Sequence, residues 1–195
     1  MPSETHAPTV GTSVDENVYA SEVDWTDPGN ITASDNTYAT AALSTLPGAT
    51  YSHALVGTTY GFAIPSTAPI VGMTLTVARK CGTGNIKDWH VQMLDTILNQ
   101  MGGTDQANAS AWPTTEGDIT YGSASDTWNW NITGSSINSE AIRPALMAQA
   151  NGGSDTASVD YFEWVVYYQQ DSQYSAAHIS NVPIIQRQTR RTVTF

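Results

Sequence analysis

A run of aromatic and β-branched residues, SVDYFEWVVYYQ at positions 158–169, has the composition of a buried β-strand. No Gly or Pro interrupts it. Because side chains alternate between the two faces of a strand, Phe162, Trp164 and Val166 share the more apolar face. In a helix the apolar side chains would lie on all sides, and the β-branched residues would lose rotamer freedom. The run therefore predicts a central strand, with these three residues in the core.

Shorter segments earlier in the chain show the same period of two. An alternating segment around Phe62 ends at Pro65, which cannot donate a ladder hydrogen bond, and a segment at 137–148 contains Pro144, which favours an edge strand. Strands at roughly regular spacing, without strongly amphipathic helices between them, predict an all-β fold, a single antiparallel β-sandwich that is jelly-roll-like. The expected core residues are Phe62, Met73, Leu75, Val77, Val91, Met93, Phe162, Trp164 and Val166.

Length and charge limit the classes of partner. A chain of 195 residues is long enough for one domain with a substantial core, and no second domain is required. The formal net charge of −11 argues against nucleic acid as a partner, because phosphate binding depends on Lys and Arg. The sequence has no basic N-terminal region followed by an apolar run and no apolar stretch of membrane length, so we expect no membrane association.

The two ends of the chain differ from its middle. Residues 1–23 are polar and lack periodicity, which predicts either a disordered segment or, as we favour, an extended N-terminal arm that orders against a neighbour. Residues 24–179 are expected to form the sandwich domain. Residues 180–195 form a C-terminal strand or arm. The last nine residues carry a charge of +3, and the 186 residues before them carry −14.

A cationic, β-prone segment of this kind is suited to pairing with the strand edge of another subunit. A solvated tail, or a last strand in the chain's own sheet, are the alternatives for the same residues. The candidate assembly residues of this arm are Ile184, Ile185, Arg187, Arg190, Arg191, Val193 and Phe195.

The motifs indicate no catalytic, cofactor or metal site. The histidines, His6, His53, His90 and His178, are far apart, and none forms the i, i+4 pair that is typical of metal ligands. The sequence has no G-x-S-x-G elbow, and the single cysteine, Cys81, has no recognisable partner motif. We therefore expect a protein that is not an enzyme and that uses no cofactor.

Two kinds of ligand stay open as alternatives. Aspartates in predicted turns could supply oxygen ligands to calcium, but there is no twelve-residue calcium loop, and capping of turns is the commoner role of such residues. These aspartates are Asp24, Asp27, Asp105, Asp118 and Asp126. Flat aromatic rings on the loops of a sandwich could instead stack on sugars. The aromatic residues considered for this role are Trp89, Trp112, Tyr121, Trp128 and Trp130.

A succession of short motifs runs from Trp25 to Tyr168. They are the Trp25 turn, Tyr60-Gly61-Phe62-Ala63-Ile64-Pro65, Ile70-Val71-Gly72-Met73, Asp88, Trp112-Pro113, Tyr121-Gly122, Asp126-x-Trp128, Ile137-Asn138 and Val159-Asp160. In this order the motifs resemble a β-sandwich domain that recurs in the structural proteins of tailed bacteriophages. The resemblance implies that the tryptophans are structural anchors rather than sugar-binding groups.

The resemblance also implies a non-enzymatic component of the virion. Within that class we favour a capsid decoration or cement protein on the capsid surface, which stabilises the head shell through subunit contacts. The expected partners are the major capsid protein and further copies of the chain, as a trimer or dimer. A tail, neck or baseplate subunit is the close alternative, and a carbohydrate-binding module is the alternative of a different class.

Overall fold

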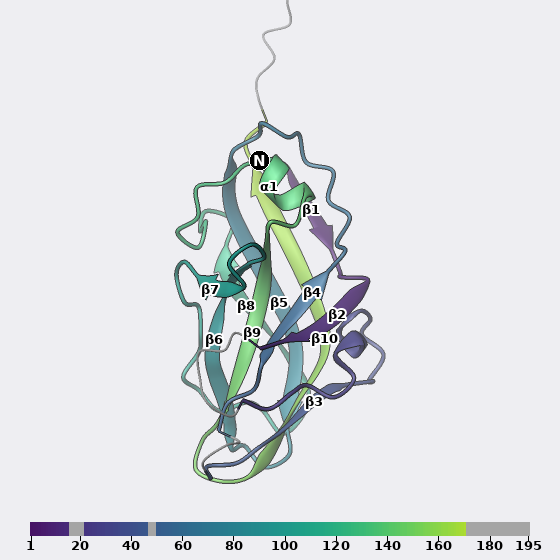
Figure 1. Cartoon of the computed structure of the whole chain (residues 1–195). Coiled ribbons are helices and arrows are strands. Elements are labelled where there is room, and N and C mark those ends of the chain that lie inside the picture. The colour runs from purple at the N-terminus through teal and green to yellow at the C-terminus, as the bar shows by residue number, and fades with distance from the viewer. Residues whose placement is uncertain (16–21, 47–49, 171–195) are drawn as a thin grey trace, which may run out of the picture.

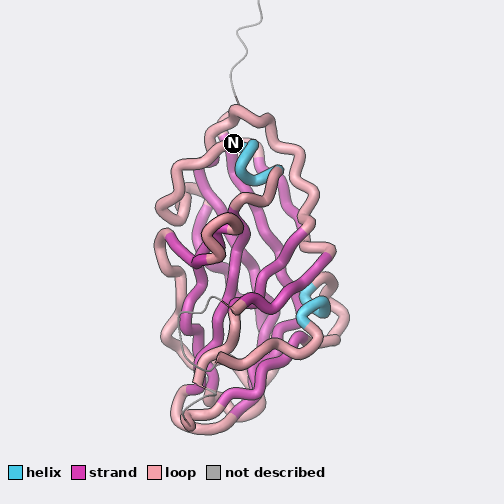
Figure 2. Tube along the Cα trace, viewed as in Figure 1, coloured by secondary structure: helices cyan, strands magenta, loops and turns pink. Residues whose placement is uncertain are grey.

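A computed structural model of the protein describes residues 1–15, 22–46 and 50–170 (Figure 1). Its strands form two antiparallel sheets that pack against each other, and the helices are short (Figure 2). The protein is a β-sandwich, which confirms the fold class predicted from the period-two patterns.

In the described part of the chain, each sheet has five strands. The first sheet has the order β1 (Ser3–His6), β10 (Asp155–Tyr168), β5 (Ile70–Cys81) and β8 (Gly117–Ser123), and β3 (Ala39–Leu43) also pairs with β10. The second sheet has the order β2 (Val10–Val14), β4 (Ala54–Thr58), β9 (Ile142–Ala150), β6 (Ile86–Asp95) and β7 (Gln100–Gly102). The helical elements of the described residues are the 3-10 helix η1 (Pro28–Ile31) and α1 (Gly134–Asn138).

The order of the strands is that of a jelly roll. If β2 and β3 are set aside, the first, eighth, third and sixth of the remaining strands form one sheet, and the second, seventh, fourth and fifth form the other. Chain neighbours such as β4 and β5 therefore lie in opposite sheets, and β10 returns to lie between β1 and β5. This interleaving is the double Greek key of jelly-roll domains.

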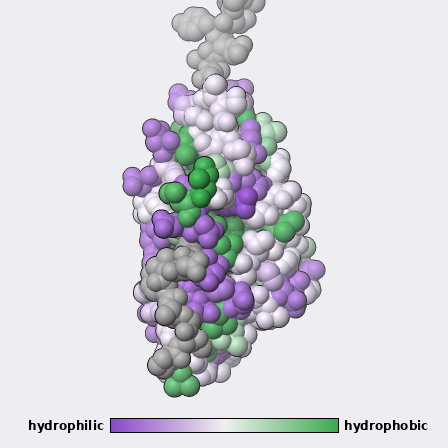
Figure 3. Space-filling view, in the orientation of Figure 1, coloured by the Kyte–Doolittle hydropathy of each residue, from purple (hydrophilic) through white to green (hydrophobic). Residues whose placement is uncertain are grey.

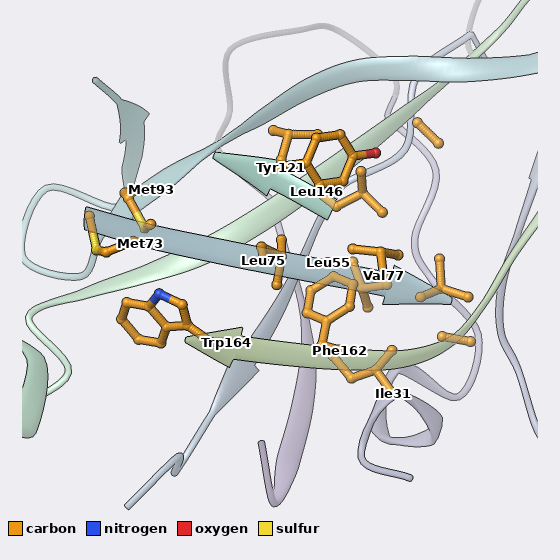
Figure 4. Close-up of a cluster of buried hydrophobic side chains, with 14 of the residues drawn as sticks. Ile31, Leu55, Met73, Leu75, Val77, Met93, Tyr121, Leu146, Phe162 and Trp164 are labelled. Carbon is orange, nitrogen blue, oxygen red and sulfur yellow. The ribbon is translucent and has the colours of Figure 1, made fainter. Parts of the chain in front are cut away.

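Strand β10 is the central strand that the aromatic run predicted. It pairs with β5 along one side and with both β1 and β3 along the other. Trp164 lies opposite Leu75 of β5, and Phe162 lies opposite Val77 (Figure 4). All nine residues expected in the core are buried in one hydrophobic cluster between the sheets. Because strands flank β10 on both sides and the second sheet packs over its inner face, its inward side chains are shielded from water along most of its length.

The N-terminal segment differs from the expected arm. Residues 3–6 form β1, in which Glu4 pairs with Val166, and residues 10–14 form β2, in which Thr12 pairs with Val56. Each sheet thus gains an edge strand from a segment whose own sequence shows no sustained periodicity. The expectation of an arm ordered by a neighbour is wrong for these residues, because strands within the same chain satisfy their hydrogen bonds. The C-terminal arm, residues 180–195, lies outside the described residues.

Strand β9 also differs from expectation, since it lies inside its sheet between β4 and β6 rather than at an edge. Pro144 lies opposite Met93 of β6. The ladder to β4 comprises Leu146 and Ala145, so it ends before Pro144 is reached. On the side of β9 that faces β4, the missing N–H of Pro144 therefore breaks no ladder hydrogen bond. Pro is for this reason tolerated in an interior strand.

Candidate functional site

A β-bulge in β6 directs Asp88 into the interior. The register of β6 against β9 shifts between Asp88 and His90, so Trp89 is the extra residue. Asp88 is 4% exposed, while Trp89 packs against a second cluster of apolar residues, separate from the main core. Val91, beyond the bulge, again points into the main core. Simple alternation would put Trp89 and Val91 on one face of the strand, and the bulge is the reason that they face different clusters.

Asp88 is the acceptor at the centre of a buried polar network. Its carboxylate accepts hydrogen bonds at 2.8 Å from Trp112 Nε1, from the Tyr121 hydroxyl and from the backbone N–H of Asn108. Nη1 of Arg79 donates to the same carboxylate, and the guanidinium carbon lies 4.6 Å from the centre of the Trp112 ring. Three residues from the succession of short motifs in the sequence, Asp88, Trp112 and Tyr121, therefore meet at one point. Their contacts join β5, β6 and β8 across the two sheets.

The titratable groups beside this network are held in their protonated forms. Burial raises the pKa of the Tyr121 hydroxyl far above its usual range, and the charge of Asp88 adds to this effect. Burial also raises the pKa of the Cys81 thiol, whose Sγ donates to the Trp112 carbonyl at 3.3 Å. A protonated thiol and a protonated phenol are poor nucleophiles, so these groups serve packing and hydrogen bonding rather than covalent chemistry.

Most of the aromatic residues considered for sugar binding are anchors within the fold. Trp112, Tyr121 and Trp128 are buried, and Nε1 of Trp128 donates to the Met73 carbonyl at 3.0 Å. Trp130 packs partly buried against the core. Trp89 is half-buried, with its ring centre 4.6 Å from that of Tyr51. Buried rings cannot stack on a sugar. Among the described residues considered for this role, the half-buried Trp89, with Tyr51 beside it, and the half-buried Trp130 keep this alternative open.

Several aspartates accept hydrogen bonds from the backbone N–H groups of loops and turns. Asp155 accepts hydrogen bonds from the backbone N–H groups of Gly82, Thr83 and Asn85 and so ties the β5–β6 loop to β10. Burial opposes ionisation of Asp155, but these hydrogen bonds outweigh it and lower its pKa to about 2. Asp105 likewise accepts from the Val91 N–H at 3.0 Å. Such carboxylates are occupied by the backbone, which fits the turn-capping role.

One cluster brings together residues that sequence spacing kept apart. One ligand atom each from Asp15, Glu22 and His53 lies within 4.8 Å of the others. Beside them, Oδ1 of Asp24 lies 2.8 Å from Nδ1 of His53 and accepts a hydrogen bond from the Ser13 hydroxyl at 3.0 Å. Sequence spacing does not reveal this cluster, because its members come from three separate segments and no local motif signals their approach. Of the aspartates considered for calcium, only Asp24 touches it.

The same cluster contains a Ser, a His and an Asp, but not in the arrangement of a hydrolase. The Ser13 hydroxyl lies 3.4 Å from Nδ1 of His53, and Asp24 contacts that same nitrogen. In a catalytic triad the Ser and the Asp bind opposite nitrogens of the imidazole ring, so that a proton can pass from one side while the other is held. Here Ser13 and Asp24 share one side, and the triad chemistry does not follow.

The turn between β6 and β7 presents two large apolar side chains to solvent. Ile97 is 85% exposed and Leu98 is 65% exposed. Both backbone N–H groups donate to Oδ1 of Asp95, at 2.8 and 3.0 Å, and the amide of Asn99 donates to the Asp15 carbonyl at 3.1 Å. In the view of Figure 3, apolar groups form small patches among polar and neutral ones. The tip is thus an apolar projection held in a fixed shape.

An apolar hollow of about 360 Å³ lies where the described chain ends. Its lining residues are Met1, Pro2, Val71, Tyr168, Gln169 and Gln170. The candidate assembly residues of the C-terminal arm follow this point in the sequence but lie outside the described residues.

Comparison with known proteins adds no relative. The sequence matches no protein-family model, and searches of curated proteins and of solved structures found no significant match. In the part of the chain that the structure describes, no helix is long and apolar enough to cross a membrane. The functional assignment therefore depends on the fold and surface of this chain alone.

Proposed function

We propose that the protein is a non-enzymatic structural component of a tailed-phage virion and, more narrowly, a capsid decoration or cement protein. Jelly rolls of two Greek keys are an architecture of viral capsid domains and also of lectins. Because one fold supports many functions, the fold alone does not define the role, and features of the molecular surface are needed to distinguish these functions.

The single observation that carries the proposal is the Ile97–Leu98 tip. Asp95 fixes the backbone of this turn through two hydrogen bonds, so little further order is lost when the tip enters a contact. Two adjacent aliphatic side chains in water are unfavourable unless a partner covers them, at roughly 25 cal/mol for each Å² removed from water. A rigid sandwich with such a tip is suited to docking in an apolar depression of a neighbouring subunit, either the capsid protein or another copy of the chain.

The titratable groups support the non-enzymatic part of the proposal. Tyr121 belongs to the Asp88 network and Cys81 lies beside it. Burial raises the pKa of both groups, which favours their protonated forms. Asp155, shifted in the opposite direction, holds a backbone loop. Perturbed groups at an active site are usually poised for proton transfer or attack near neutral pH. The pKa values of Tyr121, Cys81 and Asp155 are shifted away from neutral pH, so these groups are suited to packing and hydrogen bonding.

The test is to locate and count the protein in the intact particle. Quantitative mass spectrometry and cryo-electron microscopy of purified virions should give a copy number of hundreds on the head. A few to a dozen copies at the tail, neck or baseplate would replace the cement assignment with that of a tail-associated subunit. Absence from the particle would overturn the proposal as a whole.

A pair of variants tests the tip directly. Ile97→Ser combined with Leu98→Ser should leave the far-ultraviolet circular dichroism unchanged and reduce binding to particles that lack the protein. Leu46→Ser is the matched control, because Leu46 is also 69% exposed but lies outside the tip. Equal binding by both variants would remove the tip from the interface. Glycan-array binding that is lost on Trp89→Ala would instead favour the carbohydrate-binding alternative.

A further inference from the structure

The backbone brings Asp15, Glu22 and His53 together, so their proximity does not depend on side-chain flexibility alone. Val14, the last residue of β2, pairs with Ala54, the first residue of β4. Continuing this antiparallel register by one step sets Asp15 opposite His53, where cross-strand Cβ atoms are about 5 Å apart. The residue after Glu22, Val23, donates its N–H to Tyr51 and accepts from the N–H of His53 at 2.8 Å. Three segments are thus fastened around one point.

We propose that Asp15, Glu22 and His53 form a binding site for a divalent transition-metal ion, with zinc as the best-suited ion. One imidazole nitrogen and two carboxylates are ligands that zinc accepts, and three protein ligands with one open position describe many zinc sites. Calcium prefers six to eight oxygen ligands, so the imidazole disfavours it. Asp15 is exposed, which leaves the ion open to solvent and to a water as the fourth ligand.

The distances suit such an ion after a small contraction. The three candidate ligand atoms lie within 4.8 Å of one another. In a tetrahedral site with bonds of about 2.1 Å, ligand atoms are about 3.4 Å apart, so side-chain rotations of about an ångström complete the site. Both carboxylate oxygens of Glu22 are buried. A dication would also offset the repulsion between the carboxylates of Asp15 and Glu22.

Asp24 prepares His53 for the role of ligand. Its carboxylate lies 2.8 Å from Nδ1 of His53, which favours a proton on that nitrogen and leaves the lone pair on Nε2. The Ser13 hydroxyl donates to Asp24 and accepts from the Trp25 N–H at 3.1 Å, so the carboxylate is itself held in position. Carboxylate–histidine–metal arrangements use this same order of contacts. With Nε2 as the ligand atom of His53, Asp24 would act as a positioning residue rather than as a ligand.

The consequence of zinc binding is a clamp on the second sheet. Within residues 1–15, 22–46 and 50–170, β2 is an edge strand whose one pairing partner is β4. An ion held by Asp15, Glu22 and His53 would join the end of β2, the segment before Trp25 and the start of β4. Since such an ion binds the folded chain and not the unfolded one, it stabilises the fold by mass action. The inference is independent of the proposed virion role.

The experiment uses the full chain, stripped with EDTA and then titrated with zinc. We expect one zinc ion per chain by elemental analysis, a higher Tm with zinc, and a cobalt derivative whose visible spectrum shows four or five ligands. The ligand variants Asp15→Asn and Glu22→Gln should each weaken zinc binding at least about tenfold, and His53→Gln is the third ligand variant. The positioning variant Asp24→Asn should weaken zinc binding about 10- to 100-fold.

The control is His90→Gln, because His90 also contacts an aspartate, with Nδ1 at 2.6 Å from Oδ2 of Asp105, but lies outside the cluster. It should bind zinc as the wild type does. Asp15 is exposed, so its variant should fold, and circular dichroism checks the others. The proposal is overturned if the wild type binds no zinc, if calcium binds more tightly than zinc, or if folded Asp15→Asn and Glu22→Gln variants bind as tightly as the wild type.

Discussion

Asp88→Ala should lower the free energy of unfolding by about 3–5 kcal/mol, because it leaves the buried Arg79 guanidinium without its counter-charge. Arg79 is 3% exposed and Asp88 is 4% exposed, so water compensates neither group. The same change also removes the acceptor of Trp112, Tyr121 and the Asn108 N–H, and an unsatisfied buried donor costs about 1–3 kcal/mol. These costs overlap, so their sum is an upper bound rather than the expected value.

Arg79→Met should cost less, about 1–3 kcal/mol. The Asp88 carboxylate keeps three donors at 2.8 Å in that variant, and hydrogen bonds of this kind stabilise a buried carboxylate. Methionine also retains part of the packing that the Arg79 side chain makes against Trp112. The structure therefore predicts an asymmetry between the two members of one ion pair.

Urea unfolding followed by tryptophan fluorescence and circular dichroism measures both variants and the Arg79→Met, Asp88→Ala double variant. The double variant should cost less than the sum of the single ones, because the uncompensated guanidinium is absent from it. An m-value equal to that of the wild type shows that the variants are compared over the same transition. The reasoning fails if Asp88→Ala costs less than 1 kcal/mol, or if Arg79→Met costs more than Asp88→Ala.

Three further outcomes are expected. Trp164→Ala should cost about 3–5 kcal/mol in urea unfolding, because a fully buried ring is lost from the core; a cost near zero would mean that the core collapses around the gap. Asp155→Asn should cost about 1–2 kcal/mol at pH 7 after allowance for solvent screening. The folded pKa of Asp155 is lowered to about 2, so its contribution is present above the unfolded value near 4 and is lost as the pH falls toward 2, where wild type and variant should unfold alike. Removing residues 180–195 should leave a folded sandwich that binds particles or self-associates poorly; unchanged occupancy and sedimentation would show that this arm is dispensable.

The central strand and the core could be predicted from sequence because their signal is local. Alternation of apolar side chains in residues 158–169 is a property of the chain segment itself, and the structure keeps it over most of β10. Trp164 and Phe162 need only a sheet on their apolar side to be buried. Any packing of two sheets satisfies that condition, so the fold class followed from the pattern without knowledge of the partner strands.

The N-terminal strands, the direction of Asp88 and the metal cluster were decided by the tertiary structure. Residues 3–6 become a strand because β10 offers an unpaired edge, and nothing in their own sequence records that edge. Asp88 turns inward because one extra residue in β6 shifts the phase of alternation. His53 meets Asp15 because β2 and β4 share a register across a long separation in sequence. Period-two patterns describe which side of a strand a residue faces, whereas register and bulges depend on the neighbouring strand, and only the folded chain supplies it.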